Sequence, residues 1–557
     1  MIYHLPGVCG TGKTEHIINN IELIKNAETR TILWASLTNQ LSEATCERYK
    51  ERYPDHDSVT MISSENSSSV QSEILQRIES ASSLTTQILF ISHAALSMLS
   101  LDALRQCTII IDEIPTLISN YQRLKIPLQD ESTLGLAPFI DYEDSSFDGF
   151  QKIVVKENMK NQAKQFADDL LFHGEPNSDS VKAGDVLFGA IFNPCGLYVS
   201  TTDDWRLFEY FDGLEFISKL RQLDSVWILS ANLEGLFVDY MLKAMGCSIT
   251  TVHSLSHLAL PLTHPNTSNV EILPFLMNSS TTRSSSFSSY FAGSKACNVI
   301  KDCTEEYDVH QLFNQWTCSR FKDNSFIYCK NKYTAPISHA SAINLPPMAQ
   351  GLNSYSDLNM VAFMAHLRPA PEHESAIKRL ASDFGICPQT LVESYIRQTS
   401  FEAAYQFVSR ISFRNLERDE NGRLNIEQAQ PKCWIIVPDM AHAEYIQRMM
   451  PMASINTSFS FQRIPPQINA TENARRLTAK ATRKAQRDAK NQKFHFDILF
   501  IIHQYIDNGL NIKEACEAVG ITPRTRRNWI KQYGNDWISW LEEQELSNEL
   551  KEEINLS

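Results

Sequence analysis

A glycine-rich loop near the start of the chain constrains the fold more than any other feature. Residues 7–14 read Gly-Val-Cys-Gly-Thr-Gly-Lys-Thr and fit the pattern G-x-x-x-x-G-K-[ST]. The preceding residues, Ile-Tyr-His-Leu, can form a short buried strand. In such a loop the backbone N–H groups, together with the start of the next helix, surround phosphate oxygens. The sequence therefore predicts a strand, a loop and a helix that bind a nucleoside triphosphate.

The residues of this loop have separate expected roles. Glycine lets the backbone approach the phosphates closely and adopt positive φ where it must. Lys13 would reach the β- and γ-phosphates, and the Thr14 hydroxyl would bind Mg²⁺. We expect ATP and Mg²⁺ as the cofactors. The residues expected to bind ATP are Gly7, Gly10, Thr11, Gly12, Lys13 and Thr14.

A second motif supplies carboxylates. Residues 107–111 are apolar and rich in β-branched side chains, which predicts a strand buried on both faces. Asp112 and Glu113 follow it, at the strand end where ligands bind in open α/β sheets. Asp112 would hold Mg²⁺, and Glu113 would orient and polarise the attacking water. Alone, the pair could be an ordinary acidic turn. Combined with the phosphate loop, it predicts hydrolysis of the triphosphate.

Length and composition set limits. At 557 residues the chain has room for several domains. The net charge of −14 argues against general coating of nucleic acid but permits local basic patches. The 12 cysteines form no C-x-x-C pair, which fits a reducing cytoplasm without a zinc finger or disulfide framework. We find no signal peptide and no apolar run long enough to cross a membrane, and expect a cytoplasmic protein.

Strands and helices alternate in the first part of the chain. Residues 31–36, 88–91 and 226–229 each predict a short strand, and helical sequence follows the first two. This alternation is typical of a parallel, doubly wound sheet. Polar residues at successive strand ends suit a surface that grips a phosphate backbone, although such residues more often cap helices. The residues proposed for nucleic-acid contact here are Ser36, Thr38, Ser92 and His93.

The order of these segments resembles the motor core of superfamily 2 helicases of the DExD/H type. Residues 7–14 resemble motif I, 36–39 motif Ia and 112–115 motif II. Ser-Ala-Asn at 230–232 resembles the Ser-Ala-Thr of motif III. Motif II departs from the family pattern, because it reads Asp-Glu-Ile-Pro. The resemblance implies an α/β fold with two RecA-like lobes, each a parallel sheet flanked by helices.

The second half resembles the other helicase motifs. Residues 325–329 look like the opening strand of the second lobe, and 350–364 resemble motif V, with Asn353 as a nucleic-acid contact. Residues 406–414 resemble motif VI, which faces the triphosphate across the cleft in that family. The resemblance implies catalytic roles for Gln406, Arg410 and Arg414. The arginines are four residues apart instead of three, which predicts a shared helical face and leaves open which is the arginine finger. A surface helix with solvated arginines is the alternative.

The spacing of the motifs predicts the domain boundaries. We expect the first lobe at residues 1–270, with an insertion at about 120–222 because this interval exceeds what a compact lobe needs. The insertion can clamp nucleic acid, dock a protein partner or simply enlarge the fold. A polar hinge at 271–295 and the second lobe at 296–465 follow.

The C-terminal part changes character. A basic linker helix is expected at 466–495, because residues 475–493 include eight basic residues and only one acidic residue, Asp488. Phosphate binding by Arg483 and Lys484 is one interpretation. A solvated linker is the other.

Residues 496–557 predict a small helical unit and an acidic tail. Thr522 and Pro523 begin its third helix, in which Trp529 and Ile530 face inward. The unit resembles the helix-turn-helix of transposases and resolvases, which implies a bacterial mobile-element or phage origin. A protein-docking module is the alternative. The residues expected to contact DNA are Arg524, Arg526, Arg527 and Asn528.

Together these features predict an ATP-dependent helicase or translocase that acts on nucleic acid, with DNA favoured over RNA. The alternative is a DNA-bound initiator, recombination accessory or defence protein that uses ATP as a switch and separates no strands.

Overall fold

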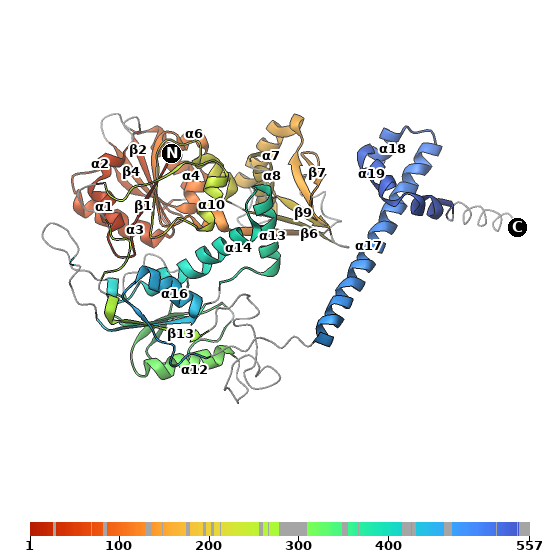
Figure 1. Ribbon diagram of the computed structural model, residues 1–557. Coiled ribbons are helices and arrows are strands. Elements are labelled where there is room, and N and C mark those ends of the chain that lie inside the picture. The colour runs from red at the N-terminus through yellow and green to blue at the C-terminus, as the bar shows by residue number, and fades with distance from the viewer. Residues whose placement is uncertain are drawn as a thin grey trace. The chain divides into compact units, whose positions relative to one another are not determined.

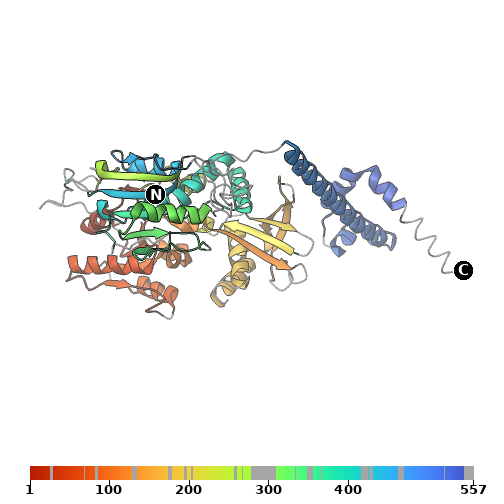
Figure 2. The same cartoon turned by 90° about the horizontal axis from the view of Figure 1, so that it is seen from below.

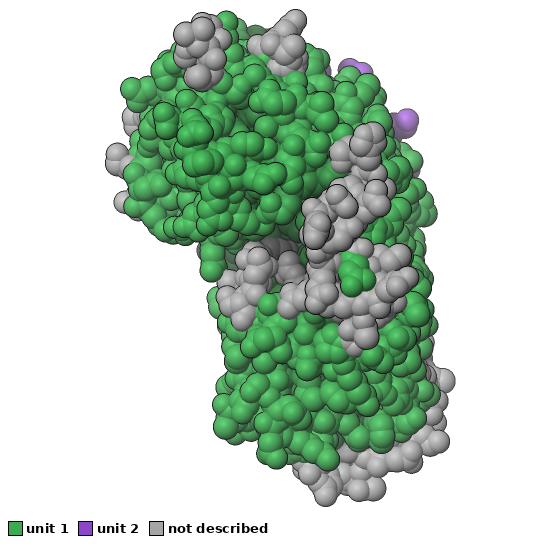
Figure 3. Space-filling view, turned by 90° about the vertical axis from the view of Figure 1, so that its left-hand side faces the viewer, with its two compact units in different colours: residues 1–464 green, residues 465–557 purple. Residues whose placement is uncertain are grey.

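The chain divides into two compact units, residues 1–464 and 465–557 (Figure 3). The computed structural model describes residues 1–544 except for 26–28, 68, 82–85, 128–134, 148, 174–178, 193–196, 202–204, 212, 256–259, 266, 278–308, 333, 348–354, 366, 415–424, 426–430, 462–469, 520 and 543. The division lies at the predicted start of the basic linker. Seen as a space-filling surface, the first unit has a hollow between two masses (Figure 3).

The first lobe is built on a seven-stranded sheet with the order β12-β1-β11-β5-β2-β4-β3 (Figure 1). All its strand pairs are parallel, as the alternation of strands and helices predicts. Its strands are β1 (Ile2–Pro6), β2 (Thr31–Ser36), β3 (Val59–Met61), β4 (Gln87–Ser92), β5 (Cys107–Asp112), β11 (Val226–Ser230) and β12 (Ile249–Thr251).

Helices cover both faces of this sheet. Alternate side chains of β2 enter different apolar clusters, with Trp34 in one and Leu33 in the other, because successive side chains of a strand point to opposite faces. The helices of this lobe are α1 (Lys13–Asn19), α2 (Ile21–Ile24), α3 (Asn39–Arg52), α4 (Val70–Glu79), α5 (His93–Met98), α6 (Leu101–Leu104), α9 (Leu214–Leu220) and α10 (Phe237–Ala244).

The insertion is a separate antiparallel module with the strand order β6-β10-β9-β8-β7. Its elements are β6 (Tyr121–Pro127), β7 (Ile140–Asp144), β8 (Gln151–Val155), α7 (Lys160–His173), α8 (Asp179–Phe192), β9 (Tyr198–Thr201) and β10 (Trp205–Phe211). The two helices and the sheet share an apolar core. The module ends earlier than the predicted residue 222, because the buried side chains of α9 belong to the core of the first lobe.

The second lobe has a six-stranded parallel sheet with the order β15-β14-β16-β17-β13-β18. Its elements are β13 (Val270–Leu276), α12 (Val309–Phe321), β14 (Phe326–Cys329), β15 (Ala342–Asn344), β16 (Met360–Phe363), α15 (Ala403–Val408), β17 (Cys433–Asp439), α16 (Met440–Met449) and β18 (Ser454–Ile455). The fold class of two parallel α/β lobes is confirmed.

Two predicted boundaries in this region are wrong. The expected hinge at 271–295 begins inside β13, which pairs with β17 and β18 in the second sheet. For the same reason β13, and not the strand at 325–329, opens the second lobe. Pro274 interrupts the strand pattern in the sequence, because proline cannot donate to a ladder and is usually read as a break. The polar residues 278–289 of the expected hinge lie outside the described part of the chain.

A helical arm of the second lobe packs on the first lobe. It consists of α13 (Pro371–Asp383) and α14 (Pro388–Ile396), followed by a π-helical segment, Arg397–Glu402, that leads into α15 (Figure 1). Ile377, Leu380 and Leu391 of the arm are fully buried in the same apolar cluster as the helices of the first lobe. This arm was not predicted from the sequence.

The arm also binds the insertion. Arg379 forms a buried ion pair with Glu209 of β10, and its guanidinium lies 3.8 Å from the ring centre of Phe150. Asp383 accepts hydrogen bonds from Lys152 at 2.5 Å and from the Tyr198 hydroxyl at 2.8 Å. On this side the insertion therefore packs against the chain's own arm. A separate protein partner for the insertion stays a prediction.

The second unit contains α17 (Ala470–Asp507), α18 (Ile512–Ala518) and α19 (Pro523–Tyr533). The expected basic linker and the first helix of the helix-turn-helix are one continuous helix, α17, which Figure 2 shows without a break. Alanine and long basic side chains support this continuity. Within residues 1–544, where they are described, no helix is long and apolar enough to span a membrane.

Gly213 offers a test of how the insertion joins the first lobe. A Cβ at this position would lie 2.3 Å from the Ile118 Cα and 2.8 Å from the Leu117 carbonyl oxygen, both rigid backbone atoms. We expect Gly213→Ala to lower the free energy of unfolding by about 1–3 kcal/mol through overpacking, measured by urea unfolding. Gly189→Ala in α8, where the nearest atom is 3.5 Å away, is the control and should be neutral or mildly stabilising. Equal stability of both variants would contradict this packing.

Candidate nucleotide site

The phosphate loop has the predicted strand, loop and helix order. The loop joins β1 to α1, which begins at Lys13. Gly10 and Gly12 have φ angles of 81° and 80°, the left-handed region that glycine adopts without strain. Gly7 is required for space rather than for its φ angle, since a Cβ there would lie 3.1 Å from the Thr11 Oγ1. The Lys13 ammonium donates to the Gly7 carbonyl at 2.7 Å, so it lies within the loop that it is expected to serve.

The second motif meets the loop at the carboxyl ends of the strands. Asp112 ends β5, and the Thr14 hydroxyl lies 3.4 Å from its Oδ2. Burial, followed by the nearby Glu113 carboxylate, raises the pKa of Asp112 to about 7. The His93 ring nitrogen lies 3.0 Å from the Asp112 carbonyl and helps to hold this strand end. A buried carboxyl and a hydroxyl at this point form a site that a divalent cation would complete.

Glu113 has an unusual backbone conformation. Its φ is 70°, a region that costs a residue with a side chain about 1–2 kcal/mol. The Glu113 N–H donates to the Leu229 carbonyl of β11 at 2.8 Å, which holds the turn in place. The turn ends strand β5 and leaves the Glu113 side chain partly exposed beside buried Asp112. Strain of this kind at a strand end is common where a side chain must be aimed at a ligand.

The second lobe reaches the phosphate loop through α15. The Cys9 backbone N–H donates to the Tyr405 hydroxyl at 3.0 Å, and the Cys9 thiol donates to the Gln406 Oε1 at 3.1 Å. His264 lies 2.9 Å from the same Tyr405 hydroxyl. Val8 and Cys9 belong to the apolar core of the second lobe. The structure therefore brings Gln406 into contact with the phosphate loop.

Glu402 connects this helix to the strand end at residues 230–232. Its carboxylate accepts hydrogen bonds from Asn232 Nδ2 at 2.9 Å, the Tyr445 hydroxyl at 2.7 Å and Gln406 Nε2 at 3.0 Å. Burial raises the pKa of Glu402, the three donors oppose this effect, and the charge of Glu113 adds to the rise.

The two predicted arginines do not share a helical face. The helix α15 ends at Val408, and residues Ser412–Arg414 form a separate 3-10 turn. Arg410 lies between them and is buried, with 4% of its surface exposed. It is therefore not a solvated surface arginine. The side chain of Arg414 lies outside the described part of the chain.

The nucleic-acid contacts expected at the strand ends of the first lobe are partly wrong. Ser36 is fully buried and is paired in register with Asp112, and His93 is only 4% exposed. Because they are buried, neither side chain is open to contact with a nucleic acid in this structure. Thr38 and Ser92 accept hydrogen bonds from the N–H groups of Leu41 and Ala95, which makes them helix caps. Asn353 lies outside the described residues.

The third helix of the second unit presents its polar side chains to solvent. Thr522 caps α19 and Pro523 begins it, as predicted. Trp529 and Ile530 pack against the apolar cluster of the unit. Arg524, Arg527 and Asn528 are exposed, Arg526 is half-buried, and Arg483 and Lys484 lie on α17.

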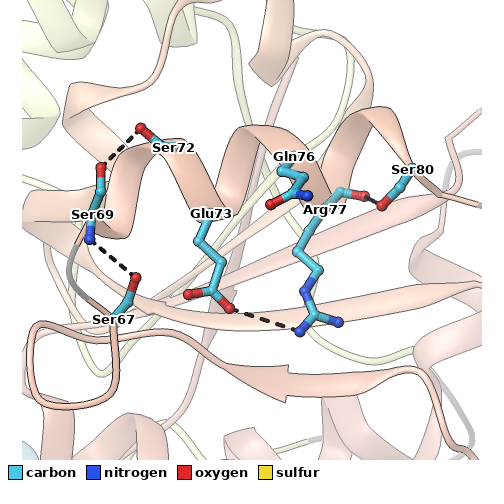
Figure 4. Close-up of a pocket in the computed structure, with 7 residues that line it drawn as sticks. All are labelled: Ser67, Ser69, Ser72, Glu73, Gln76, Arg77 and Ser80. Atoms are coloured by element: carbon cyan, nitrogen blue, oxygen red, sulfur yellow. Dashed lines mark hydrogen bonds and ion pairs between the residues drawn. The ribbon is translucent and has the colours of Figure 1, made fainter.

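One hollow in the described surface lies away from the residues predicted to bind ATP. It has a volume of about 520 Å³ and runs along α4, where Glu73 and Arg77 form an ion pair (Figure 4). Serines provide most of its remaining lining. None of the residues predicted to bind ATP contributes to it, so we assign it no role in catalysis.

Several residues around the contact between α15 and the phosphate loop were missed from the sequence. Tyr405 and Glu402 flank the contact with the loop, and Tyr445 comes from α16. One signal for Glu402 was available, since it precedes Gln406 by four residues and such pairs share a helical face. The positions of Tyr405 and Tyr445 against the other lobe have no local signal.

A match to a known protein family falls within the second unit of the chain. Residues 494–555 match the Transposase family of helix-turn-helix proteins, so the second unit contains a transposase-type helix-turn-helix. A search of curated proteins found no match.

Solved structures similar to this chain include helicases. An XPD helicase is 11% identical, with 82% of this chain and 96% of that chain covered and a TM-score of 0.42. The helicase Lhr of Mycobacterium smegmatis bound to ssDNA and AMP-PNP is 9% identical, with 82% and 47% covered and a TM-score of 0.31.

The raised pKa of Asp112 gives a pH-dependent prediction. A carboxyl with a pKa of 3.8 when unfolded and about 7 when folded destabilises the folded chain as pH rises through this interval. We expect Asp112→Asn, without Mg²⁺ or nucleotide, to unfold at a higher temperature than the wild type. The difference should grow from about pH 5 to about pH 8, since each pKa unit corresponds to about 1.4 kcal/mol. A difference independent of pH would contradict the buried, weakly compensated carboxyl.

Proposed function

We propose that the chain is an ATP-dependent motor that moves along nucleic acid, with DNA as its substrate. The observation that carries the proposal is that Gln406 of the other lobe contacts Cys9 of the phosphate loop, while Thr14 at the end of this loop lies beside Asp112. A nucleotide site that both lobes complete links binding and hydrolysis to the relative position of the lobes. That link is what a translocase or helicase requires.

The residues of the first lobe fit ATP with Mg²⁺. The loop N–H groups and Lys13 would bind the phosphates, for which Lys13 exchanges the Gly7 carbonyl for phosphate oxygens. Thr14 and Asp112 would hold Mg²⁺, which neutralises charge on the phosphates when bound. Glu113 would accept a proton from the attacking water. Gln406 and Arg410 would act from the second lobe, with Arg410 or Arg414 as the arginine finger.

The second unit favours DNA over RNA. Its match is to a transposase helix-turn-helix family, and α19 carries exposed Arg524, Arg527 and Asn528. A recognition helix of this kind suits the major groove of B-form DNA, whereas the corresponding groove of RNA duplexes is too narrow. The basic residues of α17 would add phosphate contacts. A cytoplasmic location is part of the same proposal.

An ATP-controlled switch without strand separation is the second candidate. The arm of α13 and α14 buries Ile377, Leu380 and Leu391 in the core of the first lobe. This attachment limits how far the lobes can part, which suits a switch with two close states. A strand-displacement assay beside an ATPase assay separates the two candidates, because only the helicase would release a paired strand.

The phosphate-loop lysine provides the first functional test. Lys13→Ala should lower ATP hydrolysis by about a hundredfold or more, because it removes the cation that contacts the transferring phosphate. Hydrolysis is measured with single-stranded DNA, duplex DNA and RNA in turn. Lys50→Ala, an exposed lysine of α3, is the matched control and should leave the rate unchanged. A wild-type chain without ATPase activity on any of these nucleic acids would refute the motor.

The recognition helix gives a second functional test, once a preferred DNA site has been selected. Asn528→Ala should cost about 1–3 kcal/mol at that site and little on random DNA, because a base-edge contact carries sequence preference. Arg527→Ala should weaken both complexes alike and reduce the salt slope by about one, as a phosphate contact does. Gln532→Ala, exposed near the end of α19, is the control, with binding measured by fluorescence anisotropy. Identical behaviour of all three variants would exclude α19 as the DNA-reading helix.

A further inference from the structure

A buried carboxylate lies where the two lobes meet. Its residue, Glu402, is not among the expected catalytic residues. Glu402 is the last residue of the π-helical segment before α15, and 4% of its surface is exposed. Burial of a carboxylate is costly unless hydrogen bonds compensate for it. Three donors converge on this one, from Asn232 of the first lobe and from Gln406 and Tyr445 of the second.

The three donors divide between the two oxygens. Glu402 Oε2 accepts from Asn232 at 2.9 Å and from Tyr445 at 2.7 Å, and Oε1 accepts from Gln406 Nε2 at 3.0 Å. An ionised carboxylate can only accept hydrogen bonds. The Glu402 carboxylate therefore requires the NH₂ group of Gln406 to face it. The carbonyl of the Gln406 amide then points to the opposite side.

The opposite side of that amide is the phosphate loop. Gln406 Oε1 accepts a hydrogen bond from the Cys9 thiol at 3.1 Å. With the other amide orientation, an N–H group would point at the loop. The difference matters for hydrolysis, since an attacking water can donate a hydrogen bond to a carbonyl oxygen but not to an N–H group. The proton itself would still pass to Glu113.

We propose that Glu402 is a positioning residue for ATP hydrolysis, which turns the carbonyl of Gln406 toward the phosphate loop and ties that orientation to Asn232 of the first lobe. The inference rests on the proposed function. The orienting contact depends on both lobes, because Glu402 Oε2 is held by a residue of each. A shift of the lobes that separates Asn232 from Glu402 would loosen the Gln406 amide and lower the hydrolysis rate.

The test is Glu402→Gln, which keeps the shape and changes the hydrogen-bonding groups. Its single carbonyl oxygen satisfies most donors when it faces Asn232 and Tyr445, so its NH₂ group faces Gln406. Gln406 must then turn over, which points its own NH₂ group at Cys9. Tyr445→Phe is the matched control, because it removes one donor from Oε2 and leaves the contact with Gln406 intact.

Kinetics give the first measurement, in the full-length chain with the most stimulating nucleic acid. We expect Glu402→Gln to lower kcat by about tenfold or more with KM for ATP changed less than about threefold, the pattern of an interaction made in the transition state. Tyr445→Phe should retain kcat within about threefold. A normal kcat in Glu402→Gln, or an equal loss in Tyr445→Phe, would overturn the proposal.

Thiol reactivity gives a second measurement that needs no ATPase activity. Tryptic peptide 1–13 contains Cys9 as its only cysteine, so its alkylation by iodoacetamide can be followed by mass spectrometry. An amide N–H beside the sulfur stabilises the thiolate, and a carbonyl does not. Glu402→Gln should therefore speed alkylation of Cys9 by about threefold or more.

The exchange of the two groups completes the test. In Glu402→Gln combined with Gln406→Glu, an oxygen again faces Cys9, and alkylation should return to the wild-type rate or below it. An alkylation rate at Cys9 that stays the same in all these variants would overturn the assigned orientation. If the wild type lacks ATPase activity, the proposed function fails, and the alkylation result still decides the orientation.

Discussion

The contact between the phosphate loop and helix α15 is the interaction on which the site depends. Two successive residues of this helix touch one loop residue, as Tyr405 accepts from the Cys9 backbone N–H and Gln406 from its thiol. A loop that must surround phosphates has few side chains to hold its own shape, because glycines occupy many of its positions. Here the other lobe supplies that support. The geometry of the loop therefore depends on the position of the second lobe.

The two lobes also exchange parts of their apolar cores. Val8 and Cys9 of the first lobe belong to the core of the second, and Ile377 and Leu380 of the second belong to the core of the first. Apolar burial of this kind is favourable and has little directional preference. The direction comes from polar groups within it, above all Glu402 and the ion pair between Arg379 and Glu209. Apolar contacts hold the lobes together, and polar contacts set how they meet.

Sequence reasoning found what is local and missed what is tertiary. Gly10, Gly12 and Lys13 form a short motif in which each residue type follows from phosphate chemistry, and the loop joins a strand to a helix in the predicted order. The roles given to Ser36 and His93 were wrong because burial decides them, and burial depends on the neighbouring strands. Strand β13 escaped notice because Pro274 interrupts its pattern. The arm of α13 and α14 has an ordinary helical pattern, and nothing local says which lobe covers it.

The π-helical segment Arg397–Glu402 carries a consequence for how this chain can vary. Gln398 accepts a hydrogen bond from the Val238 N–H of the first lobe, and Ser400 contacts His442 of the second. Glu402 accepts a hydrogen bond from Asn232 of the first lobe. One residue more or less in a helix turns everything beyond it by about 100°. A single deletion in this segment would rotate α14 against α15 and separate these partners, whatever residues remained. In this segment, natural variants must therefore keep the length of the chain as well as these side chains.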